Sequence, residues 1–325
     1  MTDKKIPNIE HLVLSGAAHG MYSYMGAFSV LIKHNIINIK KIKSIYGSSA
    51  GALLAVLLLI DIDIDIINDY FVERPWHELL KLDNFVNILS NYGLWNPEYM
   101  KKTFNPLFSM NDIDINITMI DFYKKTNVEL YFYATELKSF EEIEFSYKNT
   151  PDVKLLDAVY MSCSLPILFE PLLYNKKYYI DGCLINSYPI NNILNNVDDS
   201  NTIFGIKNTA EHTFEEIGLL NNHEIQEMKK EDKLYQNETQ YKNENEESGL
   251  TIIDIIQYLI LNPILKLITP NKSNLHNELE IKSCGILTFN VIKQTNSSYD
   301  HRLELINRAK KETEDFIKLK YDSSL

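Results

Sequence analysis

The chain has 325 residues, 45% of them hydrophobic, which is enough to bury the core of one large α/β domain or of one domain with an insertion. Its 32 basic and 44 acidic side chains give a net charge of -12, which argues against nucleic acid as a partner and leaves only apolar contact with a membrane. Three widely spaced cysteines, Cys163, Cys183 and Cys284, fit neither a disulfide framework nor a zinc motif and indicate a reducing compartment.

The N-terminus and the longest apolar run bear on localisation. Residues 1–8 form a polar tail without the pattern of a secretory signal. The apolar run 50–60 is too short to span a bilayer, which needs about 20 residues, and we interpret it as a buried helix. We therefore expect an intracellular protein, either cytoplasmic or peripheral at a membrane.

Two strand–loop–helix units open the chain. In the first, the strand 9–15 is followed by a loop of small residues and by a helix over 21–33. In the second, an apolar strand that starts near Lys43 runs directly into the helix from Ala50. Two such units in succession favour a parallel sheet with helices on both faces, and sites in such sheets lie at the carboxyl ends of the strands.

Further elements follow from hydrophobic periodicity and from proline positions. The predicted elements are a helical stretch over 62–91 with a break at Pro75, a loop over 96–108, strands over 128–135 and 142–147 that could pair, a helix over 154–161, an irregular apolar segment over 162–171, strands over 177–180, 201–207 and 285–291, and a terminal helix over 302–320. Between the last strands, residues 211–250 are predicted to form a mobile acidic insertion, and 251–269 an apolar helix that packs on the core or acts as a lid.

A candidate nucleophile lies where the second strand meets its helix. The five residues from Gly47 to Gly51 read G-x-S-x-G, and side chains at the two glycine positions would collide across the bend. Ser49 is thereby pushed outward at a helix N-terminus, where N–H groups and the positive end of the helix dipole face any developing negative charge. This is the arrangement that acyl transfer to a serine requires.

A serine nucleophile needs a base, and the histidines offer little. Of the eight, His19 in the small-residue loop is the only one expected near Ser49, because His11 opens its strand and the other six have polar surroundings. Asp181 is more informative, since it ends an apolar strand and precedes Gly182 on a turn. Partial desolvation would raise the pKa of such a carboxylate, so Asp181 could activate Ser49 directly, unless it only caps a turn.

The third part of the candidate site is the loop from Ser15 to Gly20. Successive N–H groups of Gly16, Ala17 and Ala18 could hold the oxyanion of an acyl intermediate, whereas no nucleotide-binding fingerprint is matched. Alanine disfavours positive φ, so these donors remain available only if both alanines adopt negative φ.

These three motifs, in this order, resemble those of the patatin-like phospholipases: S-G-A-A-H-G at 15–20, G-S-S-A-G at 47–51 and D-G-C at 181–183. Supporting stretches at 134–137 and 162–171, with Asn186 and Pro189, are also similar to that family. The chain departs from the family pattern at Ala17 and Ala18, which replace glycines, at His19, which takes a basic position, and at Cys183, which replaces a small residue.

The resemblance implies a three-layer α/β/α sandwich with a mostly parallel sheet, as a single domain over 9–325. It also implies a Ser49–Asp181 dyad that acts on phospholipids or other lipid esters through an acyl-enzyme, with neither cofactor nor metal. The residues expected to shape the site are Ser15, His19, Gly20, Gly47, Gly51 and Gly182. Two alternatives stay open, an acyltransferase that passes the acyl group to another lipid and a non-catalytic lipid-binding or scaffold protein of the same fold.

Overall fold

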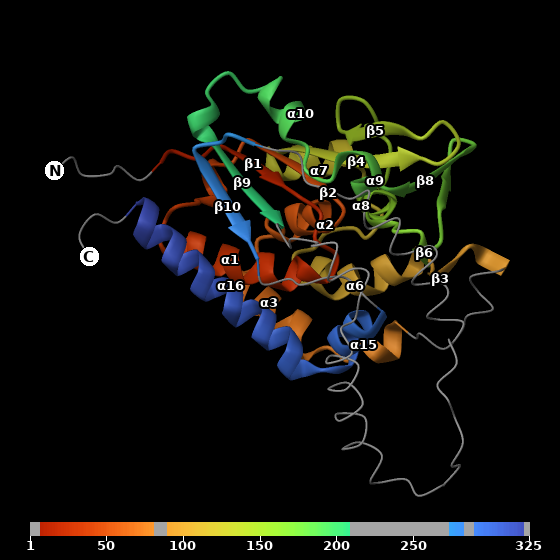
Figure 1. Cartoon of the computed structure of the whole chain (residues 1–325). Coiled ribbons are helices and arrows are strands. Elements are labelled where there is room, and N and C mark those ends of the chain that lie inside the picture. Colours follow the sequence, from red (N-terminus) through yellow and green to blue (C-terminus); the bar gives the residue numbers. More distant parts are fainter. Residues whose placement is uncertain (1–6, 81–89, 209–272, 283–288, 322–325) are drawn as a thin grey trace, which may run out of the picture. The chain divides into compact units, whose positions relative to one another are not determined.

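A computed structural model of the chain describes residues 7–80, 90–208, 273–282 and 289–321 (Figure 1). All elements described below belong to one compact unit, which comprises residues 1–210 and 267–325. The predicted insertion over 211–250 and the predicted apolar helix over 251–269 lie outside the described residues. Among those that are described, no helix has both the length and the apolar character needed to cross a bilayer.

A central eight-stranded sheet organises this unit, in the order β10-β9-β1-β2-β4-β8-β7, with β5 also paired to β4. The five strands from β10 to β4 run parallel, and β5, β7 and β8 are antiparallel additions, which confirms the predicted mostly parallel sheet. The strands are β1 His11–Leu14, β2 Ser44–Ser48, β4 Glu129–Glu136, β5 Glu141–Ser146, β7 Leu172–Tyr174, β8 Lys177–Asp181, β9 Ile203–Asn208 and β10 Asn277–Ile281, with β3 Gly93–Trp95 and β6 Ile167–Phe169 as a separate parallel pair.

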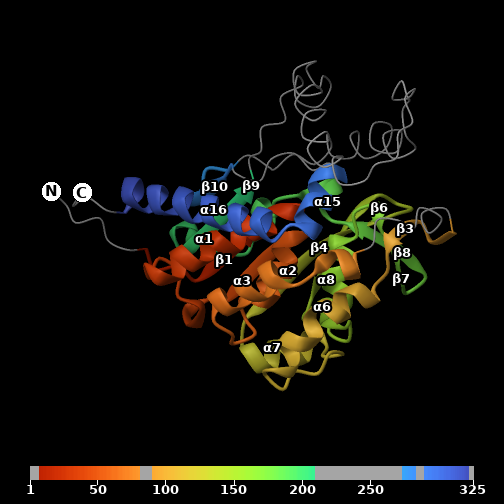
Figure 2. The same cartoon turned by 90° about the horizontal axis from the view of Figure 1, so that it is seen from below.

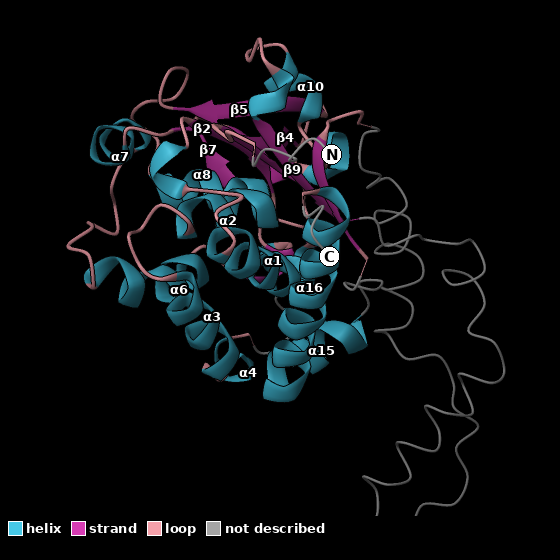
Figure 3. Ribbon diagram, turned by 90° about the vertical axis from the view of Figure 1, so that its left-hand side faces the viewer, coloured by secondary structure: helices cyan, strands magenta, loops and turns pink. Residues whose placement is uncertain are grey.

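Helices lie on both faces of the sheet, as predicted. They are α1 Met21–Lys33, α2 Ala50–Leu57, α3 Ile64–Glu73, α4 Trp76–Leu79, α6 Glu98–Ser109, α7 Met119–Thr126, α8 Leu155–Cys163, α9 Cys183–Asn186, α10 Ile190–Leu194, α15 Phe289–Ser297 and α16 Tyr299–Lys320, with short 3-10 helices η1 Ala18–Gly20, η2 Ile39–Lys41 and η3 Ser200–Thr202. Figure 3 shows α10 on one side of the sheet and α1, α2 and α16 on the other. Seen from below in Figure 2, α16 lies beside α1, and α1 beside α3.

Successive side chains along each strand point to opposite faces of the sheet, so a hydrophobic core forms on each face. Tyr46, Tyr131 and Tyr133 point to the face covered by α10, where Ile190 and Ile193 pack against them. The alternate residues face the opposite layer, in which Phe204 of β9 meets the ring of Phe316 from α16 at 6.1 Å between centroids. The central strands are therefore apolar on both faces, which is typical of a doubly covered sheet.

Two sequence-based predictions of secondary structure are wrong, and the segment predicted to be irregular over 162–171 contains the end of α8 and the short strand β6. Residues 96–108 were expected to form a loop because they carry two prolines, yet Glu98–Ser109 is the helix α6 with Pro106 inside it. The buried side chains of Met100, Phe104, Leu107 and Phe108 recur at helical spacing, and their packing outweighs the cost of about 3 kcal/mol that an internal proline imposes.

The predicted last strand over 285–291 is the second error. Residues 289–291 begin the helix α15, and 283–288 lie outside the described residues. The last strand of the described chain is instead β10, where Asn277, Leu279 and Ile281 alternate as buried residues and pair in parallel with β9. The sheet thus gains its edge strand from an earlier segment than the sequence pattern indicated.

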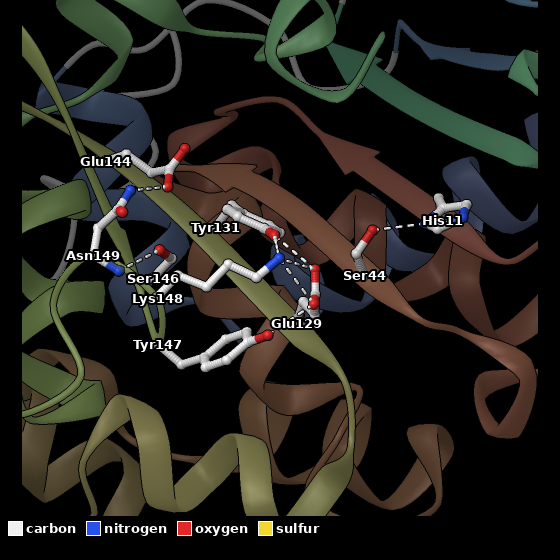
Figure 4. Close-up of polar contacts among 9 residues, drawn as sticks. All are labelled: His11, Ser44, Glu129, Tyr131, Glu144, Ser146, Tyr147, Lys148 and Asn149. Atoms are coloured by element: carbon white, nitrogen blue, oxygen red, sulfur yellow. Dashed lines mark hydrogen bonds and ion pairs between the residues drawn. The ribbon is translucent and has the colours of Figure 1, made fainter. Parts of the chain in front are cut away.

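Polar contacts at the amino ends of the parallel strands bind neighbouring strands together (Figure 4). The Glu129 carboxylate accepts hydrogen bonds from the hydroxyls of Tyr131 and Tyr147, and it accepts another from Lys148. Nearby, His11 Nδ1 lies 2.7 Å from the Ser44 hydroxyl, joining β1 to β2. His11 is therefore engaged at the end of the sheet opposite to the strand carboxyl ends, as expected.

Candidate active site

The strand β4 brings two distant motifs together. Along one edge of β4, β2 pairs in parallel up to Ser48 opposite Tyr133, and β8 pairs antiparallel with Asp181 opposite Ala134. The strand β5 pairs with the other edge of β4, so β2 and β8 share one edge of β4. The two strands run toward each other along that edge, and they end opposite neighbouring residues of β4. This head-on arrangement places the residue after β2, Ser49, against the last residue of β8.

The turn that carries Ser49 is strained in the way that the motif predicts. Ser49 has φ 51° and ψ -122°, a positive φ that a side-chain-bearing residue adopts only when its surroundings enforce it. A Cβ at Gly47 would lie 2.7 Å from the backbone nitrogen of Ala52, which is the predicted collision across the bend. A Cβ at Gly51 would instead overlap the carbonyl oxygen of Leu14, so this glycine is needed for packing of α2 on β1.

The Ser49 hydroxyl and the Asp181 carboxylate are in direct contact. Ser49 Oγ donates a hydrogen bond of 2.7 Å to Asp181 Oδ2, and the backbone N–H of Cys183 donates one of 2.8 Å to Asp181 Oδ1. Both side chains are buried, with 7% of Ser49 and 2% of Asp181 exposed. The carboxylate is thus held on one oxygen by the backbone and presents the other to the serine.

Burial sets the electrostatic state of this pair. Desolvation raises the pKa of Asp181 to about 6, although the hydrogen bonds from the Cys183 backbone and the Ser49 hydroxyl act in the opposite direction. A carboxylate with that pKa is a stronger base than an exposed aspartate and is still mostly ionised at neutral pH. The arrangement can therefore take a proton from a hydroxyl.

Ser162 of α8 supports the turn that carries Ser49. Its Oγ accepts the backbone N–H of Ser49 at 2.9 Å and donates to the carbonyl of Tyr133 at 2.6 Å, so one hydroxyl joins the turn to β4. The carbonyl of Ser162 also accepts the N–H of Gly182, and that of Ser164 accepts the N–H of Asp181. Sequence reasoning described this segment as irregular and as similar to the family, without a role for Ser162. The signal that could have found that role is a pair of serines at the end of an apolar helix.

The loop over 15–20 packs against the dyad, but its donors differ from the prediction. The N–H of Gly16 donates to the Ser187 carbonyl at 2.9 Å, so it is engaged within the fold instead of facing the site. Ala17 has the expected negative φ of -149°, whereas Ala18 has a positive φ of 47°. Gly16 has a steric role instead, because a Cβ there would overlap Sγ of Cys183 and approach Cβ of Ser49.

Ser15 and Gly20 frame this loop. The Ser15 hydroxyl lies 2.7 Å from the Tyr24 hydroxyl of α1 and accepts the N–H of Asn208 at the end of β9. The N–H of Gly20 donates to the carbonyl of Ala17, which closes η1. The loop is thereby fixed between the first helix and the sheet.

An apolar cavity of about 170 Å³ opens on the dyad. Ser49 and Asp181 line it together with Ala18, His19 and Ala50, so the structure brings His19 to the same cavity as the serine. Six aromatic residues form much of the remaining wall, namely Tyr22, Phe71, Trp76, Trp95, Tyr99 and Phe169. Sequence reasoning missed these residues, because they come from separate elements and read individually as core positions. Such a wall suits an aliphatic chain.

Two of the three cysteines lie close to Ser49 and Asp181. Cys163 lines the cavity and Cys183 lies buried beside Asp181, both as free thiols, while Cys284 lies outside the described residues. Burial raises the pKa of both thiols, and the charge of Asp181 adds to this, so both remain protonated at neutral pH. In the part of the chain that the structure describes, no three His, Cys, Asp or Glu side chains are grouped to hold a metal ion.

The sequence of the chain is similar to a known protein family and to two viral proteins. A family model described as patatin-like phospholipase matches residues 12–194, more than half of the chain. A protein of Invertebrate iridescent virus 6 named probable lipid hydrolase 463L is 32% identical over 190 residues, which cover 55% of this chain and 61% of that protein. Uncharacterized protein R571 of Acanthamoeba polyphaga mimivirus is 28% identical over 193 residues, 58% of this chain and 63% of that protein. The chain thus matches less than two thirds of either relative's length.

The solved structures that match the chain are more distant in sequence. The match to VipD from Legionella pneumophila covers 93% of this chain and 67% of the VipD chain, with a TM-score of 0.47 and 16% identity. The match to ExoU from Pseudomonas aeruginosa, solved in complex with SpcU, covers 98% of this chain and 52% of that chain, with a TM-score of 0.49 and 13% identity.

Proposed function

Because the chain belongs to the patatin-like phospholipase family, we propose that it hydrolyses acyl esters of lipids, with Ser49 as nucleophile and Asp181 as its base. The observation that carries this proposal is the 2.7 Å hydrogen bond between the two side chains beside an apolar cavity. The name of the viral relative, probable lipid hydrolase 463L, supports the same class of substrate.

The proposed reaction has two halves. In the first, Asp181 Oδ2 accepts the proton of Ser49 Oγ as that oxygen attacks the ester carbonyl, and the proton then passes to the leaving alcohol as the tetrahedral intermediate collapses. In the second, water attacks the acyl-enzyme while Asp181 accepts its proton, and the proton then passes to Ser49 Oγ as the tetrahedral intermediate collapses and the acid is released. Each half begins and ends with an ionised Asp181, so one base serves both.

Backbone N–H groups would stabilise the oxyanion in each half. Of the three donors expected from the sequence, Gly16 is engaged with Ser187, so we assign this role to Ala17 and Ala18. Ala18 lacks the negative φ on which the expectation depended, since its φ is 47°, but it lines the cavity beside Ser49. Ala50, the first residue of α2, also lines the cavity and would add an N–H at the positive end of the helix. Losing one such donor in a hydrolase costs about 3 kcal/mol of transition-state stabilisation.

The shape of the site favours lipids over short polar esters. An aromatic wall provides apolar surface for an acyl chain, and burial of each methylene contributes about 0.8 kcal/mol. Binding energy from the chain would therefore hold the ester against Ser49. We expect peripheral, apolar contact with a lipid surface and no requirement for a dissociable cofactor.

Release of fatty acid from phospholipid vesicles tests the proposal. The wild-type chain should release acid, and Ser49→Ala should reduce the rate to the uncatalysed background while keeping the same melting temperature within a few degrees. Ser29→Ala is the matched control, since Ser29 is a buried serine of α1 that does not line the cavity; its hydroxyl donates to the Met25 carbonyl and accepts from the Asn68 side chain. Equal rates for wild type and Ser49→Ala would contradict the proposal.

A further inference from the structure

Four large, mainly apolar side chains lie exposed in a row across one end of the sheet. They are Phe140, Leu137, Tyr178 and Leu173, with 51%, 45%, 45% and 55% of their surface exposed. Hydrophobic side chains scattered singly over a surface are ordinary, whereas a contiguous group of them marks a surface that contacts another molecule. Whether these four are contiguous follows from the strand pairing.

Cross-strand pairing brings the four side chains together. Leu173 of β7 pairs with Tyr178 of β8. The N–H of Leu137 donates to the carbonyl of Tyr178 at 2.8 Å, which continues the β4–β8 ladder past the end of β4. Residues 137–140 form the turn between β4 and β5, so Phe140 closes the turn that Leu137 opens. Because residues opposite each other in a ladder point to the same face, Leu137, Tyr178 and Leu173 form one row, with Phe140 at its end.

The row projects past the carboxyl edge of the sheet, where the candidate active site lies. β2 ends at Ser48, opposite Tyr133 of β4, and Leu137 comes four residues after Tyr133. At about 3.4 Å per residue, the row lies about 14 Å beyond the end of β2. Tyr178 belongs to the same strand as Asp181, the last residue of β8. A surface that touches this row therefore lies next to the edge that carries the dyad.

The charge of the two turns that carry the row is opposite to that of the whole chain. Residues 137–140 and 173–178 contain no acidic residue, and they carry three exposed lysines, Lys138, Lys176 and Lys177. The whole chain, in contrast, has a net charge of -12. At physiological ionic strength, charges more than about 8 Å away are largely screened. The lysines at the contact therefore determine the attraction of these turns to a charged surface, and the net charge of the chain does not.

The acidic residues that flank the first turn are directed elsewhere. Glu136 is only 5% exposed, and its carboxylate accepts the backbone N–H groups of Lys138 and Ser139 at 3.0 and 2.9 Å. Glu141 is exposed and pairs directly with Glu136 across β4 and β5. Both belong to the alternate set of positions, which points to the face opposite to Leu137. The face with the apolar row thus presents lysines alone.

The size and composition of the row favour a membrane over a protein partner. Strands lie about 4.8 Å apart, so the four side chains span about 14 Å. Four such side chains, each about half exposed, offer roughly 400 Å², whereas a stable protein interface buries about 800 Å² on each partner. A bilayer needs no such area of matched shape. Aromatic and aliphatic side chains enter its interface, while lysines extend their charged ends to the headgroups.

We propose that the turns over 137–140 and 173–178 dock the protein on a lipid bilayer that contains anionic headgroups. The four apolar side chains enter the headgroup region, and the three lysines face its negative charge. This deepens the proposed function by naming the docking surface and the headgroup charge, and its relevance to catalysis rests on the reaction proposed at Ser49. Docking there brings the carboxyl edge of the sheet toward the bilayer.

Sedimentation with vesicles tests the docking surface in the Ser49→Ala chain, which leaves the lipid intact. One set of vesicles is phosphatidylcholine alone, and the other contains about 30% phosphatidylserine. The chain should bind the mixed vesicles at least tenfold more tightly, since each lysine at an anionic surface contributes about fivefold. Lys176→Gln combined with Lys177→Gln should reduce this preference more than tenfold. Phe140→Ser combined with Leu173→Ser should weaken binding to the mixed vesicles at least tenfold.

Ile66→Ser combined with Met110→Ser is the matched control. Both side chains are exposed, at 52% and 63%, so the same number of exposed apolar groups is removed. Their neighbours Ile67 and Asn111 line a second cavity together with Val128, at the amino end of β4 and thus away from the row. Binding of this variant to the mixed vesicles should stay within twofold of the Ser49→Ala chain.

Three results would overturn the docking surface. Equal losses in the control and in the Phe140 and Leu173 variant would remove the row from the contact. Equal binding to the two kinds of vesicle would refute the anionic headgroups. Absence of binding to either would exclude the bilayer and make a protein the partner of these turns. A wild-type chain that releases no fatty acid would contradict the proposed hydrolysis alone, because vesicle binding is measured in a chain without the nucleophile.

Discussion

Replacing Asp181 by asparagine should abolish turnover and make the protein more stable at neutral pH. The shape of the side chain is kept, since the amide oxygen can accept the N–H of Cys183 and the amide nitrogen can donate to Ser49 Oγ. The variant loses the base, and it also loses the cost of burying a charge. That cost follows from the pKa of Asp181, which burial raises from 3.8 to about 6 and which corresponds to about 3 kcal/mol.

The sign of the pH dependence follows from the direction of this change. Because the folded protein holds the Asp181 proton more tightly than the unfolded chain does, this group favours folding at low pH, and its contribution is lost as the pH rises from about 4 through about 6. Relative to wild type, Asp181→Asn should therefore gain about 2.5 kcal/mol in free energy of unfolding between pH 4 and pH 7.5.

Urea denaturation at four pH values across this range measures the difference. Asp112→Asn is the control for losing one negative charge, because Asp112 is an exposed residue of a turn. Parallel stability curves for wild type and Asp181→Asn would refute the burial of an ionised Asp181. Gain of stability with full activity would refute its role as the base.

Three further predictions follow from the same geometry. For wild type, kcat/KM for a soluble ester should fall about tenfold per pH unit below about pH 6 and level off above it, as Asp181 must be ionised, and a flat profile down to pH 4.5 would contradict this. Ser162→Ala should lower the free energy of unfolding by about 1–3 kcal/mol and reduce kcat more than it changes KM, because the N–H of Ser49 and the carbonyl of Tyr133 lose their partner; steady-state kinetics with unchanged kcat would count against it. Gly51→Ala should destabilise the protein by about 1–3 kcal/mol through overlap with the Leu14 carbonyl, and an unchanged melting temperature would contradict the close packing of α2 on β1.

The parts of this fold that the sequence predicted are those with local causes. The helix over 21–33 and the strands that end near Ser48 and Asp181 depend on hydrophobic spacing and on small residues at turns, both visible within about ten residues. The loop predicted over 96–108 failed because tertiary packing of Phe104 and its neighbours overrides the local effect of Pro106.

Ser49 and Asp181 were predicted to act together because each lies at the end of an apolar strand, but the contact between them depends on strand pairing that no local pattern encodes. The convergence of β2 and β8 on one edge of β4 joins positions 132 residues apart. The same limit applies to the Gly16 N–H, which Ser187 engages, and to α15, which lines the cavity from a segment far from Ser49 in the sequence. Long-range contacts of this kind determine which backbone N–H groups face the site and which side chains line its cavity.

The attachment site of a fluorophosphonate probe, mapped by peptide mass spectrometry, tests the central claim most directly. The account predicts one covalent adduct on Ser49, absent in Ser49→Ala and formed at least tenfold more slowly in Asp181→Asn. An adduct on any other residue, or none on a folded wild-type chain, would contradict it.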